Sequence, residues 1–395
     1  MLRVLVLSSL FPDLSRPNFG IFVERQSLAL AERSDTEVRI IAPRGVPPWP
    51  IRALPRYRTL TALPAQENWK GLEVLRPQFL NVPMTRGRFH ATAMIEAITP
   101  VIEAVRQDFP FDIIAGEFFF PDGVAAVELG RRLGVPVSIK ARGSDVHHWG
   151  RLPVTGGQVL AAARAADGML AVSEAMRSDM IALGMPGDRI ESIITGVDLE
   201  RFAPRDRATA KRELGVDGPL ILSVGALIPL KGHEIVLRAV ANMPGVTLCI
   251  AGDGPDRQRL TALISKLGLE DRVRLLGNIS HAELARYLAA ADAMALASER
   301  EGLANAWLEA LASGTLVVIP DVGGARQVVR DAVAGRLVER TPEAFAAGLC
   351  DIIAAPPPPE AVRATVEPFT WAANSARLHE YFTRLVAAHR SRPAR

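Results

Sequence analysis

The sequence is poor in the residues that mark several classes of protein. Only two of its 395 residues are cysteines, Cys249 and Cys350, so neither a disulfide framework nor a cysteine metal site is expected, and this usage is typical of a reducing cytoplasm. No uninterrupted apolar run reaches the roughly 18 residues that a membrane-spanning helix needs. The apolar start, residues 2–10, lacks a small-residue cleavage pattern and is predicted to be a first strand rather than a signal peptide.

Other absences narrow the chemistry. Neither half of the chain has a glycine-rich GxGxxG turn after its first strand with an acidic residue about 20 positions on, which argues against a dinucleotide-dependent dehydrogenase. The net charge is only +3, and no stripe of Lys and Arg interleaved with aromatic residues suggests nucleic acid. No group of His, Asp and Glu has the spacing of metal ligands, so we expect neither a metal nor another cofactor.

What is present is core material for two domains. Apolar residues make up 49% of a chain that is longer than one hydrophobic core usually serves. Short β-rich runs alternate with helical segments, which predicts parallel sheets built from βαβ units. We expect two Rossmann-like domains, residues 1–202 and 203–370 with a linker near 198–208, and an amphipathic helix in residues 371–395. The predicted strands cover residues 4–7, 38–42, 113–115, 137–140, 220–224, 247–251, 273–276, 293–296 and 316–319.

The most informative stretch is SEREGLANAWLEALASGTLVVIPDVGG, in which seven residues separate Glu301 from Glu309. Glu301 is predicted in a loop after a buried strand, and Glu309 on a helix that begins near Asn305. A strand–loop–helix corner of this kind offers backbone N–H groups for phosphate beside carboxylates that can hold sugar or ribose hydroxyls. A nucleotide-sugar is therefore the predicted ligand, and two solvated surface glutamates are the alternative.

Together with the helix end, buried strand and small-residue turn that follow, this motif resembles the retaining GT-B glycosyltransferases of the large bacterial EX7E family, which includes polysaccharide and glycolipid hexosyltransferases. The resemblance covers nearly the whole chain. It implies an α/β fold of two Rossmann-like domains with a central cleft and a C-terminal helix that crosses back to the first domain. It also implies transfer of a hexose from a nucleotide diphosphate donor, bound mainly by the second domain, to a hydroxyl of a saccharide or lipid-linked saccharide, bound by the first.

The resemblance assigns roles to residues of the second domain. Lys231 should stabilise the departing diphosphate, but Ala226 stands where the family ordinarily has a second cation, an arginine. Glu301 and the backbone after it should hold sugar hydroxyls, and Glu309 should hold the ribose. The other predicted donor contacts, all in loops at strand ends, are Gly20, Gly225, Gly252, Gly277, Asn278, Gly302, Leu303 and Ala304.

Four further residues of the first domain complete the predicted site. Arg142 stands where many relatives have a histidine, and we hypothesise that it contacts phosphate as the third catalytic residue beside Lys231 and Glu301. Asp145 either binds an acceptor hydroxyl or bonds locally to the backbone. Asn18 and Glu117 are predicted to contact the acceptor, whereas Asp122 is expected to cap the next helix.

Residues 44–88 form an arginine- and aromatic-rich segment with many prolines. It can contact anionic lipid, which would place the enzyme at the inner face of a membrane, or it is a solvated, irregular insertion in a cytoplasmic protein. The residues concerned are Trp49, Arg52, Arg56, Tyr57, Arg58, Arg86 and Arg88.

Two further functions stay open. A sugar-nucleotide epimerase or phosphorylase of related architecture would share the two domains. A non-catalytic module that binds nucleotide-sugar would explain why Ala226 and Arg142 depart from the family pattern.

Overall fold

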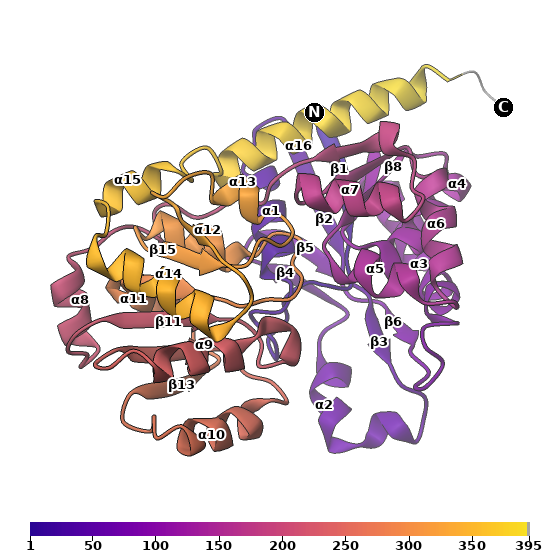
Figure 1. Cartoon of the computed structure of the whole chain (residues 1–395). Coiled ribbons are helices and arrows are strands. Elements are labelled where there is room, and N and C mark those ends of the chain that lie inside the picture. Colours follow the sequence, from indigo (N-terminus) through magenta and orange to yellow (C-terminus); the bar gives the residue numbers. More distant parts are fainter. Residues whose placement is uncertain (393–395) are drawn as a thin grey trace. The chain divides into compact units, whose positions relative to one another are not determined.

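The computed structural model describes residues 1–392, except for the side chains of Arg56, Arg58 and Thr59, and divides into two compact units. Unit 1 comprises residues 1–195 and 371–395, and unit 2 comprises residues 196–370 (Figure 1). Both are α/β units built on a largely parallel sheet. None of the helices in the described part of the chain has the length and apolar composition that crossing a membrane requires.

Unit 1 contains an eight-stranded sheet in the order β10-β9-β8-β7-β1-β2-β5-β4. Every pairing in it is parallel except that of β4 with β5, so the antiparallel pair lies at one edge. Its strands are β1 (Leu2–Leu7), β2 (Thr36–Ile41), β4 (Gln66–Trp69), β5 (Leu72–Leu75), β7 (Ile113–Gly116), β8 (Val137–Ala141), β9 (Gly168–Ala171) and β10 (Ile190–Ser192). A separate parallel pair joins β3 (Arg44–Val46) to β6 (Gln78–Leu80).

Helices and short helical turns connect these strands. The helices of unit 1 are α1 (Ile21–Ala31), α2 (Pro55–Ala62), α3 (His90–Asp108), α4 (Val124–Leu133), α5 (Ser144–His147), α6 (Gly156–Ala165), α7 (Glu174–Ala182) and α16 (Trp371–Arg390). The short turns are η1 (Ile51–Ala53), η2 (Phe119–Gly123), η3 (Trp149–Arg151) and η4 (Gly187–Arg189). The segment 44–88 is thus not an irregular insertion: it supplies α2 and four strands.

Helix α16 belongs to unit 1 although it ends the chain. Its apolar residues Leu378, Phe382 and Val386 share a buried core with strand β1 and helix α1. Asn374 Nδ2 also donates to the carbonyl oxygen of Ile194 at 2.7 Å. The C-terminal helix therefore packs within unit 1, as the resemblance implied.

Unit 2 is built on a six-stranded parallel sheet in the order β13-β12-β11-β14-β15-β16. Its strands are β11 (Leu220–Val224), β12 (Thr247–Ala251), β13 (Val273–Gly277), β14 (Ala293–Ala295), β15 (Leu316–Ile319) and β16 (Gly335–Leu337). Its helices are α8 (Arg207–Glu213), α9 (His233–Ala241), α10 (Arg257–Lys266), α11 (His281–Ala290), α12 (Asn305–Ala312), α13 (Ala325–Val328), α14 (Pro342–Ala354) and α15 (Pro359–Ala364), with the turn η5 (Pro229–Lys231).

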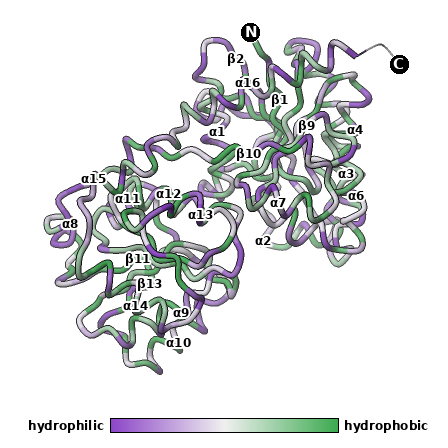
Figure 2. Tube along the Cα trace, turned by 45° about the horizontal axis from the view of Figure 1, so that its top comes forward, coloured by the Kyte–Doolittle hydropathy of each residue, from purple (hydrophilic) through white to green (hydrophobic). Residues whose placement is uncertain are grey.

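The central strands are apolar on both faces, because helices cover both sides of a parallel sheet. All four residues of β15 and all three of β14 are buried. Figure 2 shows this as hydrophobic colour along β1 and β11, with hydrophilic colour on connecting segments.

The boundary between the units lies a few residues before the predicted position. Residues 196–202, assigned from the sequence to the first domain, belong to unit 2. The cause is a set of hydrogen bonds to the end of unit 2: Val197 N donates to Phe369 O at 2.7 Å, and the guanidinium of Arg363 donates to Leu199 O and Phe202 O at 2.9 and 2.8 Å.

Candidate functional site

In unit 2 the strand order reverses where β11 lies beside β14. The chain runs from β11 outward to β12 and β13, then returns to β14 and continues in the other direction. Ligands of open α/β sheets bind outside the carboxyl ends of the strands at such a point. The loops that leave these two strands, residues 225–232 and 296–304, carry the main residues predicted to bind the donor.

Lys231 and Glu301 meet at this point. Lys231 Nζ donates to Glu301 Oε1 at 2.5 Å, and Ser298 Oγ donates to the same oxygen at 2.7 Å. The two charged side chains are only 20% and 11% exposed. The structure therefore brings together two predicted catalytic residues that are 70 positions apart, and it adds Ser298, which was not predicted.

The backbone holds the two loops in contact. Glu299 N donates to Leu230 O at 2.8 Å. Gly232 has φ +65°, and a Cβ atom there would lie 2.1 Å from the carbonyl oxygen of Ala297. Only glycine allows this conformation and this approach. Lys231 is thus held against the second loop by the residue that follows it.

Ala226 is exposed, and its carbonyl oxygen is held by His233. His233 Nε2 lies 3.2 Å from Ala226 O, and its Nδ1 lies 3.0 Å from Ser223 Oγ. Burial lowers the pKa of His233 to about 4, so the ring is neutral at pH 7, and a proton on Nε2 suits the carbonyl that faces it. A neutral histidine therefore fixes the loop in which the resemblance implied an arginine.

Glu309 lies on α12, as predicted, but the side chain nearest to its carboxylate comes from another helix. His281 Nε2, at the first residue of α11, is 3.6 Å from Glu309 Oε1. The two side chains are 19% and 14% exposed. His281 was not predicted, although it follows the predicted donor residue Asn278 by three positions. Asn278 itself is exposed at the end of β13.

The remaining predicted residues of unit 2 lie at the carboxyl ends of strands or in the loops that follow them. Gly252 N donates to Gly277 O at 2.8 Å, and Gly225 N donates to Ala251 O at 2.9 Å. Gly302 O accepts from Gly324 N at 2.9 Å, and Leu303 is buried. Ala304 is the N-cap residue of α12 and supplies no side-chain cap.

In unit 1 the strand order reverses around β1, and a buried polar cluster lies at the ends of β1, β7 and β8. Arg142 Nη2 pairs with Glu117 Oε2, and their side chains are 6% and 2% exposed. Gln26 Nε2 donates to the other oxygen of Glu117 at 2.6 Å, and Lys140 Nζ donates to Gln26 Oε1 at 2.7 Å. The guanidinium of Arg142 also lies 4.8 Å from the centre of the Phe22 ring.

In this cluster the unit 1 residues that were predicted to contact ligands are bound to neighbouring protein groups. Glu117 is buried against Arg142, so the charge of each is met inside unit 1. Asp145 is fully buried and accepts from the backbone nitrogens of Phe119, Arg142 and Gly143 at 2.7–3.2 Å. Of the two roles considered for Asp145, this geometry is that of local backbone bonding.

Asp122 does not cap the next helix, so that prediction was wrong. Helix α4 has Gly123 as its N-cap residue and no side-chain cap. Asp122 Oδ2 instead accepts from Ser9 N at 2.8 Å and Ser9 Oγ at 3.1 Å, across 113 residues of sequence. Burial raises the pKa of Asp122 to about 7, with the carboxylates of Asp145 and Glu117 adding to the shift.

Gly20, the glycine predicted to contact the donor in the loop after β1, is required by the backbone. Gly20 has φ +69°, and a Cβ atom there would lie 2.2 Å from the carbonyl oxygen of Leu10. Gly20 is also the N-cap residue of α1 and offers no side-chain cap. Asn18, two residues earlier, is exposed.

Comparison with known proteins places the chain in a family. Residues 204–366 match the family described as glycosyl transferases group 1, and residues 20–201 match glycosyltransferase family 4. Sucrose-phosphate synthase from Thermosynechococcus elongatus has a similar structure, with a TM-score of 0.78 and 22% identity over 98% of this chain and 100% of that one. The chain belongs to the GT-B glycosyltransferases.

Two other similarities bear on this glycosyltransferase. Alr3699/HepE of Anabaena, solved in complex with UDP, has a TM-score of 0.75 and 20% identity, covering 97% of this chain and all of that one. The D-inositol 3-phosphate glycosyltransferase of Mycolicibacterium gilvum is 38% identical over 218 residues, which are 52% of this chain and 49% of that protein. The glycosyltransferase thus spans about half the length of the curated relative it matches.

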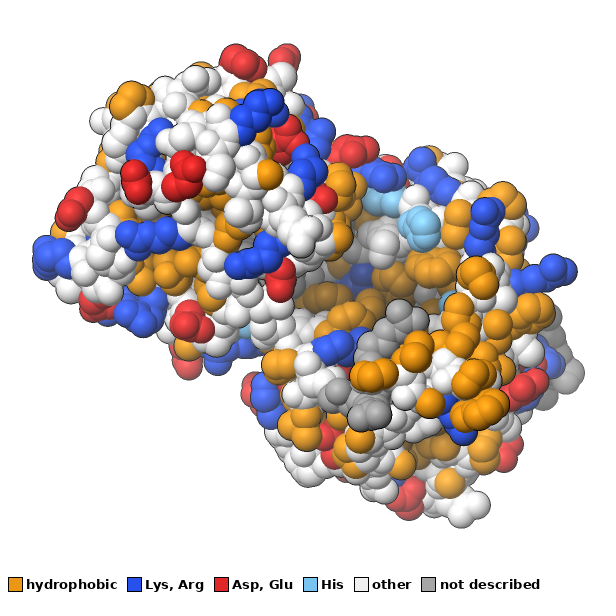
Figure 3. All heavy atoms as spheres, turned by 90° about the horizontal axis from the view of Figure 1, so that it is seen from below, with side chains coloured by type: hydrophobic (Ala, Val, Ile, Leu, Met, Phe, Trp, Pro, Cys, Tyr) orange, Lys and Arg blue, Asp and Glu red, His pale blue; other side chains and the backbone are white. Residues whose placement is uncertain are grey.

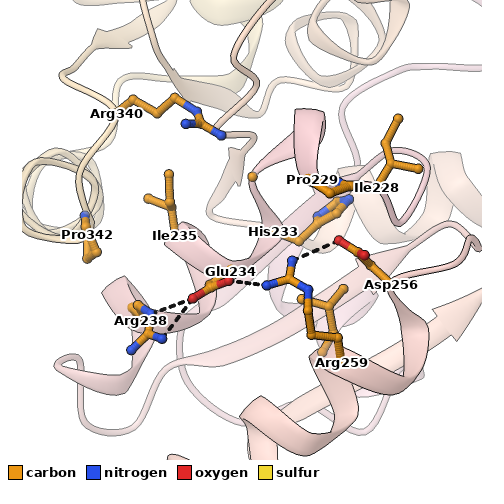
Figure 4. Close-up of a pocket in the computed structure, with 12 residues that line it drawn as sticks. Ile228, Pro229, His233, Glu234, Ile235, Arg238, Asp256, Arg259, Arg340 and Pro342 are labelled. Atoms are coloured by element: carbon orange, nitrogen blue, oxygen red, sulfur yellow. Dashed lines mark hydrogen bonds and ion pairs between the residues drawn. The ribbon is translucent and has the colours of Figure 1, made fainter.

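A cavity of about 490 Å³ lies beside the Lys231 loop, between the starts of α9 and α10 (Figure 4). Most of its charges are already paired: Glu234 contacts Arg238 and Arg259, and Asp256 contacts Arg259. Arg340 donates through Nε to Ala297 O at 2.8 Å. The cavity therefore borders the site from outside, and its side chains support the two loops.

A smaller cavity of about 240 Å³ in unit 1 gathers residues that the sequence did not single out. It lies at the carboxyl ends of β1, β2 and β5, and its wall includes His90 and Trp149, whose rings are 6.4 Å apart. The phenyl ring of Phe120 lies 6.2 Å from His90 and 5.0 Å from Trp149. The three residues come from separate segments of the chain, and no local motif links them.

Lys140 gives a prediction on pH. Complete burial, with the nearby Arg142 charge, lowers its pKa from 10.5 to about 7. Between these values the unfolded chain binds more protons than the folded one, so this group makes the free energy of unfolding rise with pH, by at most about 1.4 kcal/mol per unit. Lys140→Met should remove that rise between pH 7 and 10. Urea unfolding of both proteins across this range checks the prediction. Free energies of unfolding that rise equally with pH in the two proteins would contradict it.

Proposed function

We propose that this glycosyltransferase moves a hexose, with retention of configuration, from a nucleotide diphosphate donor to a hydroxyl of a saccharide or lipid-linked saccharide, without a metal ion. The observation that carries the proposal is the contact of Lys231 with Glu301 where the strand order of unit 2 reverses. A cation and a carboxylate held side by side there suit a ligand that is anionic at one end and rich in hydroxyls at the other.

The three N–H groups of Lys231 allow two contacts at once. One N–H is bound to Glu301, which leaves two for the diphosphate of a donor. A preorganised cation at this position stabilises the charge that develops on the leaving group. Glu301 would then hold hydroxyls of the transferred sugar, and Glu309 would hold ribose hydroxyls.

Glu301 is a poor candidate for a covalent nucleophile. Its Oε1 already accepts from Lys231 and from Ser298, and both bonds reduce the reactivity of the carboxylate. Retention without a glutamyl intermediate requires the acceptor hydroxyl to attack from the side of the departing diphosphate. In this proposal the acceptor oxygen passes its proton to that leaving group.

The relatives indicate which substrates to test first. UDP complexes of HepE make UDP-sugars the first donors, and the D-inositol 3-phosphate glycosyltransferase of Mycolicibacterium gilvum makes inositol phosphate one of the first acceptors. Thermal unfolding with UDP-, GDP- and ADP-sugars provides the binding test, because a donor at 100 times its Kd adds about 2.7 kcal/mol of apparent stability. Product mass separates transfer from epimerisation, and the anomeric proton coupling reports retention. Binding without turnover would identify a non-catalytic module.

The two glutamates should differ in what they affect. Glu309→Ala is expected to weaken donor binding by about 1.5–3 kcal/mol, because charged hydrogen bonds to the ribose are lost, whereas Glu301→Ala should act mainly on turnover. Titration calorimetry with the donor and initial rates measure the two effects. Glu343→Ala, an exposed glutamate in the first turn of α14, is the control. Unchanged affinity and rate in both variants would remove the donor-site assignment.

Activity is expected to survive excess EDTA. Lys231 and backbone N–H groups can meet the diphosphate charge without a metal ion. Initial rates measured with EDTA, and then with added Mg²⁺ or Mn²⁺, check this prediction. Complete loss that either ion restores would contradict it.

A further inference from the structure

A face of unit 1 carries large apolar side chains in contact with solvent. Trp49 is 75% exposed and Met84 99%, with Leu54, Leu80 and Phe89 at 45%, 48% and 51%. We call these five residues the exposed apolar cluster. Within the described residues seven large apolar side chains are at least 45% exposed, and five of them fall in the stretch 49–89. Figure 3 shows hydrophobic side chains gathered on one face of this unit. Isolated exposed apolar residues are ordinary, but a gathering of them marks an interaction site.

The local backbone keeps these side chains outside the core. In strand β6 successive residues face opposite ways, so Phe79 is buried and Leu80 points outward. In the following turn a Cβ atom on Gly87 would lie only 2.9 Å from the rings of Phe120 and Trp149, so the backbone packs directly on these rings. Met84 and Arg86 in this turn have φ +62° and +50°, which is costly for residues with side chains. The backbone of this turn is thus held against the core at Gly87, while the side chain of Met84 points into solvent.

The surroundings of the cluster carry charge of one sign. No Asp or Glu occurs in residues 38–66 or 77–95. Arg52, Arg86 and Arg88 are exposed, and none of them pairs with a carboxylate in the part of the chain that the structure describes. Apolar side chains flanked by unpaired arginines fit a surface that is apolar inside and anionic outside.

We propose that unit 1 docks on an anionic lipid bilayer through the exposed apolar cluster and these three arginines, and takes a lipid-linked sugar from it as acceptor. This rests on the glycosyl transfer proposed above. Tryptophan and methionine enter the interfacial region, while each arginine near anionic lipid adds about 1 kcal/mol, or roughly fivefold in binding. A second copy of this chain is a poor occupant, because a twofold contact would bring the same arginines face to face.

The cavity of about 240 Å³ in unit 1 lies next to this face. Its wall includes Phe79, Asn81 and His90, which alternate along the chain with Leu80 and Phe89 of the cluster. The His90 imidazole and the Asn81 amide have no hydrogen-bond partner among the described residues, so both are available to a ligand. With the rings of Phe120 and Trp149 they form a small site for one polar ring. The sugar of the acceptor would enter this cavity while its lipid remains in the bilayer.

Vesicle sedimentation of the full chain tests the proposal. The probes are vesicles of phosphatidylcholine alone and of phosphatidylcholine with phosphatidylglycerol. The wild type is expected to bind only the vesicles that contain phosphatidylglycerol. It should bind them less at about 0.5 M salt, because salt screens the attraction between the arginines and the anionic lipid. Trp49→Ser with Met84→Ser should weaken binding at least about tenfold. Arg86→Ala with Arg88→Ala should weaken it about 25-fold. Ile181→Ser with Arg164→Ala, an exposed apolar and an exposed basic residue elsewhere in unit 1, is the matched control and should bind as the wild type does.

Three results would overturn the docking proposal: a wild type that does not sediment with phosphatidylglycerol vesicles, docking variants that bind as tightly as the wild type, or a wild-type dimer that the docking variants abolish. Thermal shift with UDP-glucose runs in parallel on every variant and is expected to be unchanged. Vesicle binding through this face by a chain that binds no nucleotide sugar would instead overturn the proposed glycosyl transfer and leave the docking surface in place.

Discussion

Lys231→Ala is expected to lower the turnover number by about 10²–10³, the loss seen when one preorganised donor to a developing charge is removed. The effect should be large because Ala226 stands where the resemblance implies a second cation, so Lys231 is the one cation of unit 2 predicted on the diphosphate. The variant also removes a donor from Glu301, 2.5 Å away, and leaves Ser298 as its recorded hydrogen-bond partner. The turnover number at saturating donor measures the effect.

Lys211→Ala is the matched control. Lys211 Nζ contacts Asp292 Oδ2 at 2.5 Å, with side chains 17% and 19% exposed, much like the pair at the site. It lies at the amino end of β11, however, where Asp292 also accepts from Leu220 N at 2.6 Å. Loss of this pair should lower stability and leave the rate per folded molecule unchanged. Equal rate losses in both variants would mean that Lys231 acts only through the fold.

The unit 2 site was open to prediction because its residues follow strand ends. A buried strand, a short loop and a helix start can be read locally, so the loop position of Glu301 and the helical position of Glu309 follow from the sequence. The contact between Lys231 and Glu301 needed more: their loops meet because β11 and β14 are neighbours in the sheet, which the resemblance implied and local sequence does not state.

The partners of unit 1 residues could not be predicted in this way. Arg142 was expected to be free for phosphate, yet sheet order places β8 beside β7 and brings Glu117 to it from 25 residues away. Gln26 reaches the same pair from α1. The same holds for Asp122, which accepts from Ser9 N, after the neighbouring strand β1, and does not cap the helix that follows it. Such pairings depend on which strands are adjacent, and no spacing along the chain records this.

The arginines of residues 44–88 show the same limit. The sequence left this segment as either a lipid-contacting surface or a solvated insertion, and neither alternative predicts that Arg44 and Arg76 are only 5% and 2% exposed. Arg44 donates to the carbonyl oxygens of Leu60, Leu63 and Arg76, and Arg76 pairs with Glu67 at 2.5 Å. Burial and the neighbouring Arg76 charge lower the pKa of Arg44. Two arginines thus order the segment from within, and Arg52, Arg86 and Arg88 are left on its surface.

Arg142→Ala is expected to lower the free energy of unfolding by about 3–5 kcal/mol, because removing one partner of a buried ion pair leaves the other charge uncompensated. The side chain of Glu117, 2% exposed, would keep Gln26 as its recorded hydrogen-bond partner. Urea unfolding of the variant and the wild type measures the loss. Donor affinity, which in our proposal depends on unit 2, should not change.

Glu117→Gln with Arg142→Met separates this role from phosphate binding. The double variant removes both charges and keeps an amide beside Gln26, so it should recover most of the stability that Arg142→Ala loses. If Arg142 acts only inside the buried polar cluster, the rate per folded molecule should recover together with the stability. A rate that stays about 10²–10³ lower in the stable double variant would show that the guanidinium contacts phosphate during the reaction. Adding Ala226→Arg to that variant should then restore part of the rate, since it returns a cation to the donor loop.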